Sequence, residues 1–162
     1  MAFHYSRKNQ SALLQTGLDL TSSLGWRKDA IAFGVFGPEG DDDLRAVAVF
    51  QNFDAYGGEF HFGMVPGCHI TLEIMQVMAV LAFHPMAMNL QSVVAHILED
   101  NVPAQLAALK CGFSFEYRKR SGVEGGKDAI MMMKKRVTAL PATAKPHDQN
   151  AEPAHEVVDY GR

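Results

Sequence analysis

The segment Glu99–Arg120, with the sequence EDNVPAQLAALKCGFSFEYRKR, constrains the fold of this chain more than any other part of it. It follows an apolar run typical of a strand, residues 90–98, and it ends in a pattern that alternates aromatic and charged residues. Asn101 stands at a helix N-cap position, Pro103 falls in the first turn, and Gly112 is placed to close the helix. The segment therefore predicts a short helix between two strands.

The inward face of this helix and the strands beyond it can also be predicted. Leu106 and Leu109 are three residues apart and are the expected buried stripe of the helix. The run FSFEYRKR and the later KDAIMMMKK are joined by the glycine-rich SGVEGG. This pattern predicts a β-hairpin.

Upstream of this segment, helix and strand patterns follow one another. Residues 11–24 predict one or two short helices, because Gly17 interrupts an apolar period. Three runs rich in Val, Ile and Phe and bounded by Gly, Pro or Asp predict antiparallel strands, at residues 30–37, 44–53 and 59–65. In the third strand, alternation predicts one face with Phe60, Phe62 and Met64 and the other with Glu59, His61 and Gly63.

A nearly continuous apolar stretch follows the third strand. Thr71 is the expected N-cap of a helix that Pro85 ends near Phe83. Its apolar surface predicts deep burial against a sheet.

This order of elements predicts an α/β fold with a mixed, mostly antiparallel central sheet flanked by helices. Residues 1–136 are expected to form a single domain. Residues 137–162 are rich in Pro and Ala and have no apolar period, so they are expected to be a C-terminal tail, either flexible or docked on a partner.

Composition excludes several classes of function. A net charge of −3 does not favour nucleic acid as a partner. The two cysteines have no CxxC spacing, which fits a reducing, cytoplasmic compartment and excludes a disulfide framework. The N-terminus has no apolar core of a signal peptide, and no apolar run reaches the roughly 20 residues of a membrane span. The seven histidines form no metal-binding spacing, so no metal is expected.

The segment from Asn101 to Gly112-Phe113, together with the late GGKDAIMMMKKR, resembles the GNAT superfamily of N-acetyltransferases. Within it, the chain most resembles the branch of ribosomal-protein acetyltransferases and their phage-encoded relatives. The resemblance covers roughly residues 29–136. It implies a sheet that is splayed between the fourth and fifth strands in the family's numbering. In this chain these strands correspond to residues 59–65 and 90–98.

The resemblance also implies acetyl-CoA as co-substrate. In that family the pantetheine arm lies along the fourth strand, the Asn of the strand-to-helix turn contacts it, and the helix opened by that Asn flanks it. The diphosphate is bound by backbone N–H groups at the start of the preceding helix. The positions that match are Met64, Val65, Gly67, His69, Thr71, Asn101 and Ala104. For Asn101, the role of a plain N-cap explains the residue equally well.

The diphosphate loop departs from the family pattern. The usual Arg/Gln-x-x-Gly-x-Gly/Ala is reduced to VPGCHIT, with one glycine and no arginine. Glu73 falls in the helix turn that should bind phosphate, and a negative charge there opposes an anion. His69 compensates for part of this charge.

The catalytic residues depart from the family pattern as well. Glu59 and His61 share a strand face and are the candidate bases, and the alternative is that both are solvated strand residues. The family's tyrosine acid would fall within 107–108, which are alanines, and the serine of the ribosomal branch is Ala104. Either Tyr117 is the acid, or the thiolate leaves unassisted.

Two functions follow from the resemblance. The first is an acyltransferase that moves an acetyl group from acetyl-CoA to a primary amine of a protein or small molecule. The second is a catalytically silent GNAT-fold module for interaction or assembly, as in a phage virion-associated protein. A homo-oligomer, or an assembly partner bound through the C-terminal tail, is compatible with both. The expected location is the cytoplasm, or the virion for a phage protein.

Overall fold

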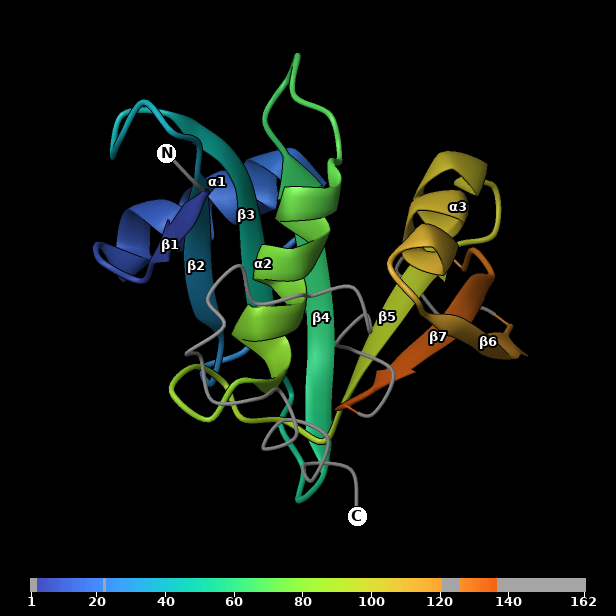
Figure 1. Cartoon of the computed structure of the whole chain (residues 1–162). Helices are drawn as coiled ribbons and strands as arrows, with labels where there is room; N and C mark the ends of the chain where they lie inside the picture. Colours follow the sequence, from blue (N-terminus) through green and yellow to red (C-terminus); the bar gives the residue numbers. More distant parts are fainter. Residues whose placement is uncertain (1–2, 22, 121–125, 137–162) are drawn as a thin grey trace. The chain divides into compact units, whose positions relative to one another are not determined.

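A computed structural model describes residues 3–21, 23–120 and 126–136, and the predicted tail lies outside these residues. Contacts divide the chain into two compact units, Met1–Met78 and Ala79–Arg162, which are described one after the other. The helices and strands, labelled in Figure 1, are β1 His4–Ser6, α1 Gln10–Thr21, β2 Ile31–Phe36, β3 Leu44–Gln51, β4 Gly57–Met64, α2 Leu72–Phe83, β5 Ser92–Leu98, α3 Val102–Lys110, β6 Ser114–Lys119 and β7 Ala129–Lys135.

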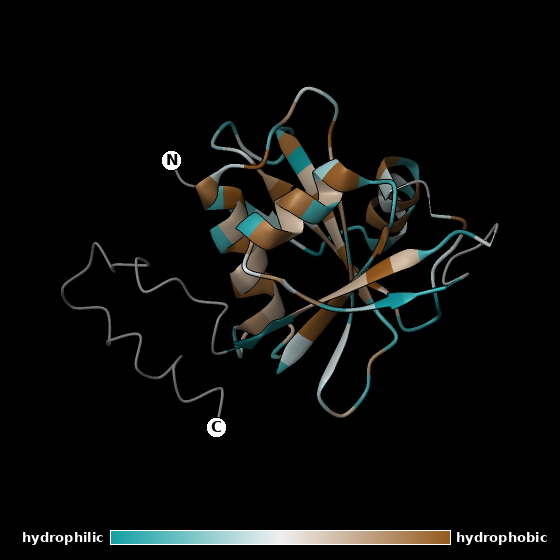
Figure 2. Cartoon of the chain, turned by 90° about the vertical axis from the view of Figure 1, so that its right-hand side faces the viewer, coloured by the Kyte–Doolittle hydropathy of each residue, from teal (hydrophilic) through white to brown (hydrophobic). Residues whose placement is uncertain are grey.

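The first unit is an antiparallel sheet of β1, β2, β3 and β4, in which each strand pairs with the next along the chain. The predicted strands 30–37, 44–53 and 59–65 are thus confirmed. β3 is the most buried of them, because five of its consecutive residues, from Ala46 to Phe50, are wholly buried. Such apolar residues are coloured brown in Figure 2.

Helix α1 packs on this sheet (Figure 1). Leu13 is buried with Val47 and Val49 of β3, so the predicted apolar period of this segment does mark its inward face. Gly17 lies in the same contact. A Cβ atom at Gly17 would lie 3.0 Å from Val49 and 3.3 Å from the indole ring of Trp26. The glycine therefore permits a close approach of helix to sheet, and it does not divide the helix.

The two faces of β4 are those predicted from alternation. Phe60 stacks on Phe62 with ring centroids 6.1 Å apart, and Phe60 also contacts Phe50 of β3. On the other face, His61 contacts Trp26. Glu59 and His61 therefore share the face that bears α1 and the loop after it.

α2 begins and ends as predicted. The Thr71 hydroxyl accepts a hydrogen bond from the backbone N–H of Ile74, which makes it the N-cap. The helix ends at Phe83, two residues before Pro85. Ile74, Leu81 and Phe83 are almost completely buried, as the apolar surface predicts.

The second unit is an antiparallel sheet of β5, β7 and β6, with α3 beside it in Figure 1. The hairpin of β6 and β7 was predicted. The Asn101 side chain caps α3 by accepting a hydrogen bond from Ala104 N–H at 3.2 Å. Gly112, with φ of 84°, ends the helix while its N–H bonds to the carbonyl of Leu109.

The predicted buried stripe of α3 was wrong. Leu106 and Leu109 are 53% and 52% exposed, whereas Ala108 is buried. The Gln105 amide donates hydrogen bonds to the carbonyls of Leu98 and Glu99 at the end of β5. These bonds turn the Gln105 and Ala108 side of the helix inward, so the leucines point to solvent.

The predicted class, α/β with mostly antiparallel strands and flanking helices, is confirmed. The expected splay between β4 and β5 concerns the placement of one unit against the other and stays a prediction. Among residues 3–21, 23–120 and 126–136, no helix has the length and apolar character needed to cross a membrane.

Candidate active site

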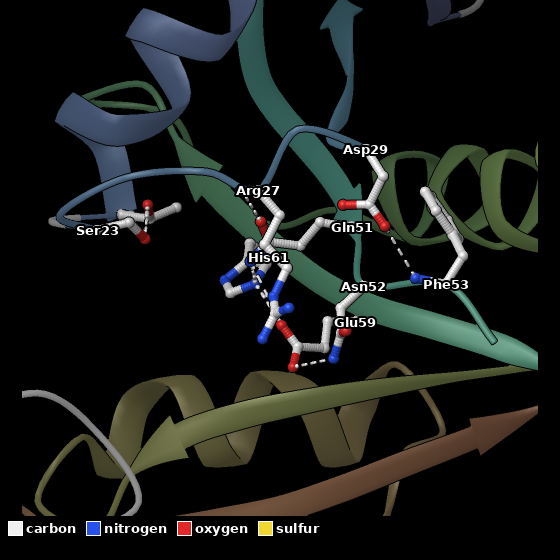
Figure 3. A network of polar contacts seen from close by, with 9 residues as sticks. Ser23, Arg27, Asp29, Gln51, Asn52, Phe53, Glu59 and His61 are labelled. Carbon is white, nitrogen blue, oxygen red and sulfur yellow. Dashed lines mark hydrogen bonds and ion pairs between the residues drawn. The ribbon is translucent and has the colours of Figure 1, made fainter.

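A network of polar side chains lies where β3 and β4 pair, and Gln51 is at its centre (Figure 3). Gln51 is the last residue of β3, is only 7% exposed, and lies opposite Glu59 in the register of the two strands. Its Nε2 lies 3.3 Å from Glu59 Oε2 and 3.1 Å from His61 Nε2. One buried amide thus joins both candidate bases.

The loop after α1 covers this network. The Arg27 backbone N–H donates a hydrogen bond to Gln51 Oε1 at 2.9 Å. The indole of Trp26 meets the His61 ring edge-on, with centroids 5.1 Å apart, and its Nε1 donates to the carbonyl of Leu14. The side chains of Gln51 and His61 are therefore fixed from the side of the sheet that bears α1.

Glu59 and His61 are partly buried. Their side chains retain 19% and 23% of their accessible area, and Glu59 Oε2 lies 3.7 Å from His61 Nε2. The second carboxylate oxygen of Glu59 accepts a hydrogen bond from Asn52 Nδ2 at 2.9 Å. Both residues thus have a fixed geometry and still reach solvent, which a base that meets a substrate requires.

At the end of β4, two successive backbone N–H groups point in opposite directions. One is hydrogen-bonded to β3, and the other points away from β3. The Val65 N–H donates to the carbonyl of Arg45 on β3 at 2.9 Å. Because N–H groups alternate in direction along a strand, the Met64 N–H points away from β3. Of the two predicted main-chain positions, Met64 is therefore the one whose N–H group points away from β3.

The start of α2 carries an anion of its own. The Glu73 carboxylate accepts hydrogen bonds from its own backbone N–H and from the Thr71 hydroxyl, and these hold the pKa of Glu73 below its usual range. Gly67, with φ of 85°, and His69 are exposed in the loop before it. A negative charge at this helix N-terminus opposes the binding of an anion.

The other predicted site residues belong to the second unit. Asn101 is the N-cap described above, Ala104 is the residue that it caps, and Tyr117 on β6 is 53% exposed. The structure brings Glu59 and His61 together in one network within the first unit. The part of the chain that the structure describes has no group of three or more metal-ligating side chains.

Sequence reasoning missed Gln51, Arg27 and Asn52. A signal for Gln51 was available, because a polar residue directly ends the apolar run VAVF and pairs across a hairpin with a candidate base. Arg27 contributes to the network through its backbone N–H, and a pattern of side chains in the sequence does not reveal such a contact.

The fold is that of the N-acetyltransferases of the GNAT superfamily. Among solved structures, a chimera of the Vibrio cholerae spermidine N-acetyltransferase SpeG and hSSAT aligns with a TM-score of 0.67 at 14% identity, over 83% of this chain and 96% of that chain. A dodecameric structure of the Vibrio cholerae enzyme aligns with a TM-score of 0.66 at 13% identity, over 87% of this chain and 98% of that chain. A complex of SpeG with manganese ions aligns with a TM-score of 0.62 at 14% identity, over 83% and 92%.

No family model and no curated protein matches the chain. The similarity therefore concerns the fold of N-acetyltransferases in general. It does not support the ribosomal-protein or phage-encoded branch in particular.

Proposed function

We propose that this protein transfers an acetyl group from acetyl-CoA to a primary amine of a protein or small molecule. The observation that carries the proposal is the partly buried Glu59–Gln51–His61 network on β4, in a chain with an N-acetyltransferase fold. Acetyl transfer needs a base for the ammonium, donors for the oxyanion and a proton for the leaving thiolate. The network meets the first of these needs.

The remaining roles are assigned as follows. The Met64 N–H is the candidate donor to the oxyanion, because it points away from β3. Tyr117 is the candidate acid for the thiolate, and departure of an unassisted thiolate is the alternative. Gly67, His69 and Thr71 bind the diphosphate end of acetyl-CoA, and Asn101 with Ala104 borders its pantetheine arm.

The acceptor is proposed only as a class. The similar solved structures are spermidine N-acetyltransferases, so a polyamine joins protein amino termini and lysines among the amines to be tested. One of these structures is dodecameric, which favours a homo-oligomer here as well. The proposed location is the cytoplasm.

One observation favours the second candidate function, a catalytically silent module. Glu73 places a carboxylate on the helix N-terminus that should bind the diphosphate. A protein that no longer binds acetyl-CoA has no need to keep this position free of negative charge.

The experiment that separates the two functions is calorimetric titration of the full chain with acetyl-CoA. It is followed by an assay of thiol release with spermidine, a peptide with a free amino terminus and a lysine peptide. Binding together with thiol release from any of these amines supports the transferase. If no binding is detected at millimolar acetyl-CoA, the result supports the second candidate function, a catalytically silent module.

A further inference from the structure

The orientation of the Gln51 amide follows from its neighbour in the loop after α1. The Arg27 backbone N–H can only donate, so the Gln51 atom 2.9 Å from it must be the carbonyl oxygen Oε1. The reverse orientation would set two donors against each other in a buried position, at the cost of an unsatisfied polar group. The NH₂ group of Gln51 therefore points to β4 (Figure 3).

The two hydrogens of this NH₂ group have two acceptors. One is directed to Glu59 Oε2 and the other to His61 Nε2. For the second bond, His61 Nε2 must contribute a lone pair, so the ring proton of neutral His61 is on Nδ1. In this state His61 has no lone pair left with which to accept a proton from a substrate.

Glu59 differs from His61 in this respect. Its carboxylate accepts one hydrogen bond at Oε2 from Gln51 and one at Oε1 from Asn52. Each oxygen of a carboxylate can accept more than one hydrogen bond, so the contacts with Gln51 and Asn52 do not prevent a proton from binding. The side chain also keeps 19% of its accessible area.

We propose that Gln51 is a positioning residue that holds His61 in the Nδ1–H tautomer and thereby makes Glu59 the proton acceptor. The inference rests on the proposed acetyl transfer and decides between its two candidate bases. A proton of the substrate ammonium moves to a Glu59 oxygen, directly or through one water. The neutral amine then forms the C–N bond to the acetyl carbon, and the C–S bond breaks. The nitrogen gives up its second proton to water, and the departing sulfur takes a proton from Tyr117 or, if the thiolate leaves unassisted, from solvent.

The first test is the tautomer of His61, read from the ¹⁵N chemical shifts of the imidazole rings at alkaline pH. The His61 signals are assigned by their loss in His61→Asn. We expect Nδ1–H in the wild type and a shift toward Nε2–H in Gln51→Leu, because Nε2 is then free to donate to Glu59. Gln15→Leu is the matched control, since Gln15 is an exposed glutamine that bonds to the Asp19 carboxylate on α1. A wild-type His61 with the proton on Nε2 would overturn the proposal.

The second test is kinetic. Gln51→Leu and Gln51→Glu should lower kcat at least tenfold while KM for acetyl-CoA changes less than twofold, and Glu59→Gln should lower kcat more than His61→Asn does. Equal losses in the last two variants, or a wild-type kcat in Gln51→Leu, would overturn the assignment of the base. If no amine is acetylated, the proposed function fails and Glu59 loses this role, while the ¹⁵N shifts still decide the tautomer.

Discussion

At the start of α2, the backbone N–H of Glu73 and the Thr71 hydroxyl hold the pKa of the Glu73 carboxyl below its usual range. Thr71 also caps the helix by accepting a hydrogen bond from Ile74 N–H, so this donor is engaged without any ligand. In the proposed transferase, the diphosphate of acetyl-CoA has to compete with Glu73 for these donors.

Glu73→Gln should therefore strengthen acetyl-CoA binding. Removal of one negative charge at a helix N-terminus favours a bound anion, so the dissociation constant of acetyl-CoA should fall by up to about fivefold. Calorimetry at low salt measures this change. Asp42→Asn, in the exposed turn between β2 and β3, is the control with the same change in net charge. Equal affinity of the Glu73 variant and the wild type would show that the diphosphate does not bind at this turn.

Glu59→Gln should lower turnover by roughly 10²–10⁴, the usual effect of losing a general base. Its acetyl-CoA affinity should stay unchanged, since in the proposed mechanism Glu59 takes a proton from the acceptor and does not bind the co-substrate. Rates of thiol release between pH 6 and 9, with spermidine or a peptide as acceptor, give the comparison. Wild-type rates over that whole range would mean that the amine reacts after losing its proton in solution.

Asn101 has a confirmed role as N-cap and a proposed role in acetyl-CoA binding, and two substitutions separate them. Asn101→Ala should destabilise the fold by about 0.5–2 kcal/mol through loss of the cap, measured by urea unfolding. Asn101→Ser keeps a capping oxygen, so its stability should match the wild type.

Asn101→Ser should nevertheless bind acetyl-CoA more weakly, by about 0.5–1.5 kcal/mol, since the shorter side chain withdraws a hydrogen bond. Calorimetry on this stable variant isolates the contact from the cap. If Asn101→Ser binds acetyl-CoA with wild-type affinity, Asn101 caps the helix and does not contact acetyl-CoA.

The orientation of α3 makes a prediction about stability. Leu106→Ala should change the free energy of unfolding by less than about 0.5 kcal/mol, because the side chain is half exposed. Ala108→Leu should destabilise by about 1–3 kcal/mol, because the added carbons have no space on the buried side. Urea unfolding of the two variants measures both effects. A larger loss of stability in Leu106→Ala than in Ala108→Leu would mean that the leucine side of α3 is the buried one, as expected from the sequence.

Local rules predicted the ends of the helices well. Thr71, Pro85, Asn101 and Gly112 act within one turn of where they stand in the chain, and the structure confirms each of them. Strand alternation likewise predicted that Glu59 and His61 share a face, because alternation depends only on the strand itself.

Features that depend on distant partners could not be predicted. The rotation of α3 is set by the bonds of Gln105 to carbonyls of the preceding strand and turn, and the spacing of its leucines carries no information about these bonds. The role of Gln51 requires the register of β3 with β4 and the position of the Arg27 backbone, 24 residues away along the chain.

The close approach at Gly17 has a consequence for how this protein tolerates mutation. A Cβ atom at Gly17 would lie 3.3 Å from Trp26, and Trp26 contacts His61, so an added methyl group on α1 presses on the proposed active site through a single aromatic ring. Gly17→Ala is therefore a candidate for a temperature-sensitive allele, in which activity is lost on warming before the fold is. In a random mutagenesis screen, such a variant would be found as a loss of function at a residue outside the proposed catalytic network.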